Sequence, residues 1–451
     1  GRKIYNSLVT VTQKRYKEMV KKKLYRSIKE ELKLIYQSKD KINLKRKTEL
    51  CKQLNEMYKQ YKLNEYSFHS DVKNMQKHFK NNIDSFTAQK IATNLWKAYD
   101  KLLFGKGECI HYKKYDTFNS FEGKTNSTGI RFKDNNLIWN GLNIPVIIDY
   151  KNPYESQALE NEIAYCRVVR KFVRNKYKFY LQIVFKGIAP VKINKQTGEV
   201  KHTLGNGDVG IDIGTRTIAY SSKTDVKIYE LADRVQNIEN QKRILLRKLD
   251  RSRRVCNPNN YNEDGTIKKQ GNKKVTWVKS NHYIKIQNQL KELYRKQADI
   301  RKLQHEILAN EILEQGDNIY VETMNYAGLQ KRAKKTEKND KGKFKKKKRF
   351  GKSLANKAPS MLLSIIDRKL KYYDRQLIKI DTYSVKASQY NHFDETYTKK
   401  KLSDRWNDFN GIKVQRDIYS AFLIMNVNTD LKTINNDKCN ETFENFLILH
   451  N

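Results

Sequence analysis

The segment Asp208-Val-Gly-Ile-Asp212-Ile-Gly-Thr-Arg-Thr-Ile-Ala219 decides the fold of the C-terminal half of the chain. Successive side chains of a β-strand point to opposite faces, so Val209, Ile211 and Ile213 share one face. Asp212 stands on the other face, between two glycines. The pattern predicts a strand whose carboxylate lies in a clearing that admits a metal ion and a sugar-phosphate backbone. The signal is weak alone, because a strand-end Asp beside glycines more often belongs to a turn.

A second acid occupies a similar position in Asn318-Ile-Tyr-Val-Glu322-Thr-Met-Asn325. Ile319 and Val321 point to one face of a short apolar strand and Glu322 to the other. Glu is disfavoured in strands, so its presence requires a reason. The alternative explanation is an edge strand that carries a solvated acid.

A third acid belongs to a predicted helix, Val414-Gln-Arg-Asp417-Ile-Tyr-Ser-Ala421-Phe-Leu-Ile-Met425. At helical spacing Asp417 shares its face with apolar residues, namely Val414, Ile418, Ala421 and Met425. A carboxylate on an inward face is costly unless it is paired or coordinates a metal ion. Arg416 is the obvious pairing partner, and a metal ion explains the pattern equally well.

Together Asp212, Glu322 and Asp417 form the carboxylate set of a two-metal phosphodiesterase. Mg²⁺ prefers oxygen ligands, and two such ions stabilise the attacking water and the leaving 3′ oxygen of an in-line displacement. No Cys, Ser or His nucleophile is needed. We therefore predict an Mg²⁺ site, with two ions, in which these three acids are both the metal ligands and the catalytic residues.

The three segments resemble the RuvC motifs of the TnpB family of transposon-encoded RNA-guided nucleases, which is related to type V CRISPR effectors. The matching residues are Gly-Ile-Asp212-Ile-Gly, Val-Glu322-Thr-Met-Asn and Arg-Asp417-Ile-Tyr-Ser-Ala, and the similarity extends from about 207 to 425. The resemblance implies a guide RNA, recognition of a short target-adjacent motif, and cleavage of both strands of a target DNA by one RuvC site. It also implies an RNase H-like mixed α/β sheet with helical insertions.

The resemblance, with the residue patterns, predicts four parts. Residues 1–105 form a helical recognition domain, 106–206 a β-rich, barrel-like wedge domain with a linker, 207–430 the RuvC-like nuclease domain, and 431–451 a C-terminal tail. The first wedge strand expected before the helices is missing and the chain opens with Gly1, so we expect the start to have been trimmed.

Zinc is not expected. Family members usually carry a C-x-x-C…C-x-x-C finger between the second and third motifs, whereas 384–411 contains no cysteine. The five cysteines lie far apart without metal-ligand or disulfide-framework spacing: Cys51, Cys109, Cys166, Cys256 and Cys439. The finger is interpreted as degenerate, which leaves the three acids unaffected.

The charge predicts the partners. Lys and Arg total 92 against 49 acidic residues, a formal net charge of +43. Like charges in such excess destabilise a lone compact chain, so a polyphosphate partner is expected. No apolar run is long enough for a membrane span. We expect a monomer on one RNA, in the cytoplasm of a prokaryote and associated with the nucleoid when bound to DNA.

Between 331 and 357 more than half of the residues are Lys or Arg. Most such runs are solvated, and a localisation signal is another option. Because this run follows a proposed catalytic strand, a lid or nucleic-acid clamp is comparably plausible. Arg416 either orients Asp417 or contacts phosphate. The other candidate nucleic-acid contacts are Lys331, Arg332, Lys334, Lys335, Lys345, Lys346, Lys347, Lys348 and Arg349.

Two rival functions remain open from the sequence. A nuclease-dead, RNA-guided DNA-binding regulator of the same family would share most of these features, although the presence of all three acids argues against it. An unguided transposase acting on its own element's ends would also use carboxylates, and co-purifying RNA would distinguish it.

Overall fold

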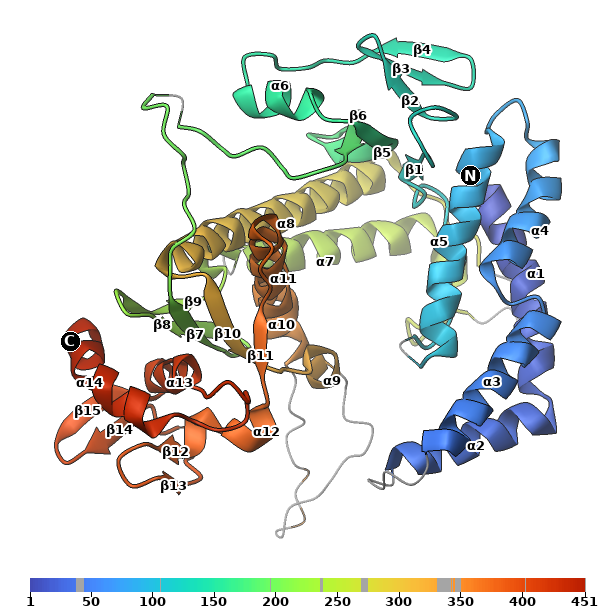
Figure 1. Cartoon of the computed structure of the whole chain (residues 1–451). Helices are drawn as coiled ribbons and strands as arrows, with labels where there is room; N and C mark the ends of the chain where they lie inside the picture. Colours follow the sequence, from blue (N-terminus) through green and yellow to red (C-terminus); the bar gives the residue numbers. More distant parts are fainter. Residues whose placement is uncertain are drawn as a thin grey trace. The chain divides into compact units, whose positions relative to one another are not determined.

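The structure is a computed structural model that describes residues 1–451 except 38–43, 106, 195, 236–237, 269–274, 331–341, 343, 345–349, 402 and 451. The chain divides into two compact units, Gly1–Pro190 and Val191–Asn451. Figure 1 shows the elements of both units. The fold is mixed α and β, and among the described residues no helix is both apolar enough and long enough to cross a membrane.

The first unit combines a helical part with two small antiparallel sheets. Its helices are α1 (Arg2–Val20), α2 (Lys23–Gln37), α3 (Leu44–Gln60), α4 (Glu65–His78), α5 (Ser85–Leu103) and α6 (Pro153–Leu159). Its strands are β1 (Ser120–Glu122), β2 (Arg131–Lys133), β3 (Asn136–Trp139), β4 (Leu142–Pro145), β5 (Ile163–Val173) and β6 (Lys176–Phe185), in the orders β1-β5-β6 and β2-β3-β4. Apolar residues of α1 to α5 form one core, and a smaller core lies between the sheets.

The second unit is built on a five-stranded mixed sheet of order β11-β10-β7-β8-β9. The strands are β7 (Asp208–Ile213), β8 (Thr217–Ser221), β9 (Val226–Glu230), β10 (Asn318–Glu322) and β11 (Ile378–Ile380). β7, β8 and β9 are successive antiparallel neighbours, whereas β10 runs parallel to β7 and β11 parallel to β10. The predicted strands at 208 and 318 are therefore adjacent in space.

Helices cover both faces of this sheet. The helices of the unit are α7 (Ile238–Cys256), α8 (Asn281–Gln315), α9 (Tyr326–Gln330), α10 (Gly351–Lys357), α11 (Pro359–Leu370), α12 (Thr382–Val385), α13 (Arg416–Met425) and α14 (Asn436–His450). The face of Val209 and Ile211 packs on α8 and α11. The opposite face, which includes Ala219 and Ile380, packs on α13 and α14. Residues 431–451, expected to form a tail, thus contain a helix of the core.

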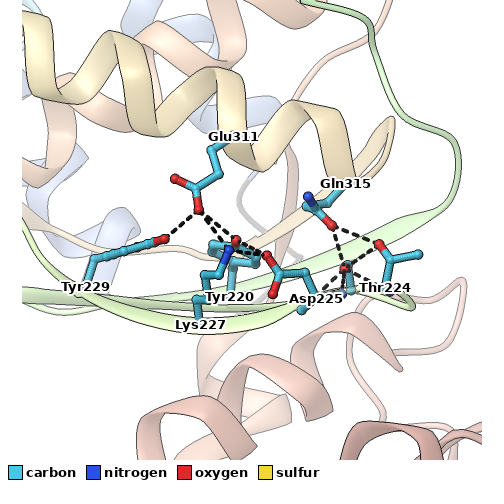
Figure 2. A network of polar contacts seen from close by, with 8 residues as sticks. Tyr220, Thr224, Asp225, Lys227, Tyr229, Glu311 and Gln315 are labelled. Carbon is cyan, nitrogen blue, oxygen red and sulfur yellow. Dashed lines mark hydrogen bonds and ion pairs between the residues drawn. The ribbon is translucent and has the colours of Figure 1, made fainter. Parts of the chain in front are cut away.

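A polar network joins α8 to the β8–β9 hairpin (Figure 2). The carboxylate of Glu311 accepts hydrogen bonds from Tyr229 at 2.5 Å and Tyr220 at 3.2 Å, and it pairs with Lys227 at 3.3 Å. Tyr220 also donates to Asp225 at 2.7 Å. A buried phenol is stable only when its hydroxyl is bonded, so this network fixes the long helix on the sheet.

Aromatic rings form the core of the segment 384–411, which has no cysteine. It contributes the hairpins β12 (Tyr390–Asn391) with β13 (Thr396–Tyr397), and β14 (Trp406–Phe409), which pairs with β15 (Ile412–Gln415). His392 is 2 % exposed, and its Nδ1 is hydrogen-bonded to the Tyr419 hydroxyl at 2.6 Å. Its other ring neighbours are Phe393, Phe409, Phe422 and Phe443.

This burial makes stability depend on pH. Burial lowers the pKa of His392 to about 4, whereas an unfolded histidine titrates near ~6.5. Between these values the unfolded state binds more protons, so the stabilisation is complete above ~6.5 and is lost as the pH falls through about 4. The difference corresponds to about 3 kcal/mol.

We predict that the free energy of unfolding, measured by urea titration, falls between pH 7 and pH 4.5 and that His392→Gln flattens this decline. His282→Gln, a change at an exposed histidine of α8, is the matched control and should leave it unchanged. In His392→Gln the free energy of unfolding should still fall slightly with decreasing pH, because burial also lowers the pKa of His305. An equally steep decline in the His392 variant would contradict the assignment.

Candidate functional site

The register of the sheet brings the first two predicted acids together. In the parallel pair β7–β10, Val321 lies opposite Ile211, so the next residues along the strands are Asp212 and Glu322. Both point away from the α8 face, because their neighbours Ile211 and Val321 are buried there. β10 lies between β7 and β11, so the alternative of a solvated acid on an edge strand is wrong.

Gly210 sets the position of the third acid. A Cβ on Gly210 would collide with the Ala421 carbonyl oxygen and the Met425 backbone nitrogen, so the backbone of α13 lies directly on β7. The prediction that both glycines beside Asp212 open a clearing is therefore corrected. The space beside Gly210 is filled by a helix, and only Gly214 is open, with Thr217 as its nearest neighbour at 3.6 Å.

The same contact places Asp417 near Asp212. Asp417 precedes Ala421 by about one helical turn, ~5.4 Å of rise, and Asp212 follows Gly210 by two strand residues, ~6.6 Å. α13 therefore has its N-terminal turn over the C-terminal end of β7. The three acids come from two adjacent strands and one helix, as predicted from the sequence.

The acids interact electrostatically. The pKa of Asp212 lies well above its usual range, first because of burial and then because of the charges of Glu322 and Asp417, and Arg416 opposes the shift. Burial raises the pKa of Glu322 to about 7. Carboxylates that repel one another in a desolvated site require protons or a bound cation.

Asp417 is neutralised by two arginines. Arg416 holds its Oδ1 at 3.0 Å and also donates to the carbonyl of Asp404 at 3.0 Å, and its side chain is only 12 % exposed. Arg405 reaches Oδ2 at 3.3 Å with a side chain that is 57 % exposed. Arg416 is thus a fixed part of the site, whereas Arg405 makes one long contact from the surface.

The donor set suits a hard cation, because it consists of carboxylate oxygens. In the described part of the chain, no three His, Cys, Asp or Glu side chains already converge as metal ligands. Arg416 and Arg405 bind different oxygens of Asp417. Each carboxylate oxygen has a further lone pair, so Asp417 can accept a metal ion while both contacts persist.

Two features of the site were not predicted from the sequence. The contact of Arg405 with Asp417 joins residues twelve positions apart, and no sequence pattern indicated it. Tyr326 begins α9, and its pKa is raised by burial and by the charges of Asp212 and Glu322. Its hydroxyl donates to the carbonyl of Ile213 at 3.5 Å, which places a phenol at the end of β7.

The remaining predicted contacts belong to the basic run after α9. Lys331, Arg332, Lys334, Lys335, Lys345, Lys346, Lys347, Lys348 and Arg349 lie outside the described residues. The residues on either side do meet, because a Cβ on Gly351 at the start of α10 would lie 3.7 Å from the carbonyl oxygen of Gln330 at the end of α9.

No protein-family model matches the chain, and no curated protein is similar to it. Among solved structures, 95% of this chain aligns with 82% of a chain in the cryo-EM structure of a CRISPR-Cas12f ternary complex. The sequence identity is 14% and the TM-score is 0.25. These values establish no shared fold, so the functional argument depends on the residues of the site.

The packing of α13 on β7 predicts opposite outcomes for the two glycines beside Asp212. Gly210→Ala should lower the free energy of unfolding by about 3 kcal/mol or more, because neither backbone can move away without separating helix and sheet. Gly214→Ala should change it by no more than about 1 kcal/mol. The midpoint of urea unfolding measures both, and an equal effect of the two changes would refute the close helix–strand contact.

Proposed function

We propose that this protein is an RNA-guided DNA endonuclease encoded by a transposable element, which cuts double-stranded DNA beside a short target-adjacent motif. The observation that supports this best is the side-by-side register of Asp212 and Glu322 under the N-terminal turn of α13, which carries Asp417. An all-carboxylate set on rigid elements suits a nuclease that uses Mg²⁺.

The sheet supports an RNase H-like, RuvC-type core. Three antiparallel strands, β7 to β9, are followed by β10, which is parallel to β7, and β11, which is parallel to β10. The acids lie on β7, on β10 and on α13. The α7–α8 hairpin is the kind of helical insertion expected between the first two motifs. The sequence resemblance to TnpB gives this core its proposed substrate and guide.

The proposed cofactor is Mg²⁺, in two ions held by Asp212, Glu322 and Asp417. Bound there, the ions would supply a hydroxide nucleophile and stabilise charge on the phosphate. The chain's own contribution is to hold the acids by strand register and close packing, and to hold Asp417 in an ion pair with Arg416. Arg416 is therefore proposed to orient Asp417, and its burial argues against direct phosphate contact.

The proposed partners are a guide RNA and a target duplex, with one protein chain on one RNA. The net charge of +43 supports a polyphosphate partner. In such a complex, base pairing with the guide supplies sequence specificity while the protein holds backbones and duplex shape.

The decisive test is Glu322→Gln, which keeps the shape of the side chain and removes its charge. Cleavage of target DNA in Mg²⁺ should fall by roughly 10³-fold or more, while guide RNA and target DNA still bind. Asp212→Asn and Asp417→Asn should behave alike, and the triple variant should be scarcely worse than any single one, because residues that act as a unit are not additive.

Glu444→Gln on α14 is the control, since this exposed acid is remote from the site in sequence and should leave cleavage unchanged. Wild-type cleavage by Glu322→Gln would eliminate the assignment of the second motif. An unmodified protein that binds target and never cuts it would favour the DNA-binding regulator, and one that purifies without RNA and still acts on DNA would favour the transposase.

A separate prediction concerns zinc. We propose that the segment 384–411 contains no zinc, because rings around His392 form its core and it has no cysteine. Elemental analysis of purified protein should find no stoichiometric zinc, and a zinc chelator should leave the urea midpoint unchanged. One tightly bound zinc per chain would contradict this.

A further inference from the structure

The end of the α7–α8 hairpin is a folded tip, and the buried side chain of Asn257 holds it together. Asn257 is 6 % exposed, and its side-chain amide donates to the carbonyls of Arg253 at 2.8 Å and Val278 at 2.9 Å. Its Oδ1 accepts from the Val278 amide at 2.7 Å. The described residues that lead into α8 are thereby attached to the last turn of α7.

This tip contains a partly open pocket of about 150 Å³, lined by Arg253, Trp277, Val278, Lys279 and Tyr283. The lining thus combines two aromatic rings with two cations. An engineered cavity of similar volume in another protein binds benzene, so the space is suitable for one aromatic ring. Asn257 holds these walls in place before any ligand arrives, which lowers the entropic cost of binding.

The cations are positioned beside the rings. The Arg253 guanidinium lies 5.2 Å from the ring centroid of Trp277, and the Lys279 ammonium lies 5.8 Å from that of Tyr283. Arg253 Nη2 pairs with Asp250 at 2.6 Å, whereas its Nε is buried and has no partner among the described residues. An unsatisfied buried donor is costly, and an acceptor on a ligand would satisfy it.

These features select the ligand class. An apolar ligand would leave Arg253 and Lys279 unused, and a free inorganic anion would leave the rings unused. A nucleotide uses both, because its base stacks on an aromatic ring and its phosphate pairs with a cation. A base inside a duplex is not available for such stacking, so the nucleotide must be unpaired.

We propose that the α7–α8 tip binds one unpaired nucleotide of a single-stranded nucleic acid, with the base on Trp277 or Tyr283 and the phosphate at Arg253 and Lys279. The site is distinct from the carboxylates and requires no cleavage. Two sources offer the same chemistry, namely an unpaired stretch of the guide RNA and an unpaired DNA strand.

The test uses the full-length protein and fluorescein-labelled oligothymidine or oligouridine of about 12 nucleotides, followed by fluorescence anisotropy. Trp277→Ala should weaken binding by about 5-fold to 100-fold, the range for loss of one stacked base. Trp277→Phe keeps a ring and should restore most of the affinity, which excludes simple misfolding of the tip. Tyr372→Ala, at another exposed ring of the same unit, is the control and should have no effect.

The salt dependence of the affinity distinguishes the contribution of base stacking from that of phosphate pairing. Lys279→Ser should reduce the slope of log affinity against log salt by about one, while Trp277→Ala leaves the slope unchanged. Unchanged affinity in both Trp277→Ala and Lys279→Ser would overturn the proposal, whether or not the protein cuts DNA.

Cross-linking identifies whether the bound nucleotide belongs to the guide RNA or to a DNA strand. 4-Thiouridine in the co-purified RNA, or 4-thiothymidine in one DNA strand, is irradiated in the complex and the adduct is mapped by mass spectrometry. An adduct on Trp277 or Tyr283 with RNA assigns the nucleotide to the guide, and one with DNA assigns it to the DNA strand. Adducts confined to residues outside the tip would overturn the proposal.

Discussion

The backbone contact between α13 and β7 at Gly210 is the constraint on which the candidate site depends. A helix that carries side chains on its contact face normally stands about 10 Å from a sheet, too far for its first turn to meet a strand acid. Because Gly210 has no side chain, the backbone of α13 can pack directly on β7. This close packing brings Asp417 near Asp212. The parallel register of β10 and β7 places Glu322 beside Asp212. One missing Cβ and one parallel pairing therefore bring together residues that are 205 positions apart in the sequence.

Assembling three acids creates an electrostatic problem, which the structure solves only in part. Arg416 and Arg405 compensate Asp417, but neither contacts Asp212 or Glu322, and the pKa values of both acids are raised. A fully compensated cluster would gain little from a cation, whereas an uncompensated one would destabilise the fold. Asp212 and Glu322 therefore need protons or a bound cation, whereas two arginines compensate the charge of Asp417. The contact from the more exposed Arg405 should be easier to break than the contact from Arg416.

The sequence was sufficient to predict the type of element that carries each candidate acid, because period-two and helical patterns surround Asp212, Glu322 and Asp417. It could not reveal strand register, which depends on pairing between distant segments. It also led to a wrong interpretation of Gly210, since a glycine that admits a ligand and one that admits a helix backbone look identical in a single chain. Tyr326 and Arg405 were missed for the same reason: their positions follow from tertiary contacts. At the hairpin tip, Asn257 fitted a polar turn, and nothing local indicated that it closes a cavity.

The region around His392 shows how ring packing can order a segment that has no cysteine. A zinc finger gains its stability from a few strong coordinate bonds, which fix short loops that bury little apolar surface. Here the hairpins of 390–415 bury rings against α13 and α14, and His392 is surrounded by Phe393, Phe443 and Tyr419. Dispersion and area burial act over many contacts and leave no single bond on which the segment depends. Because Tyr419 lies two residues after Asp417 on α13, the same ring cluster also holds the helix that carries the third acid, so the order of this segment and the geometry of the acids are maintained by one core.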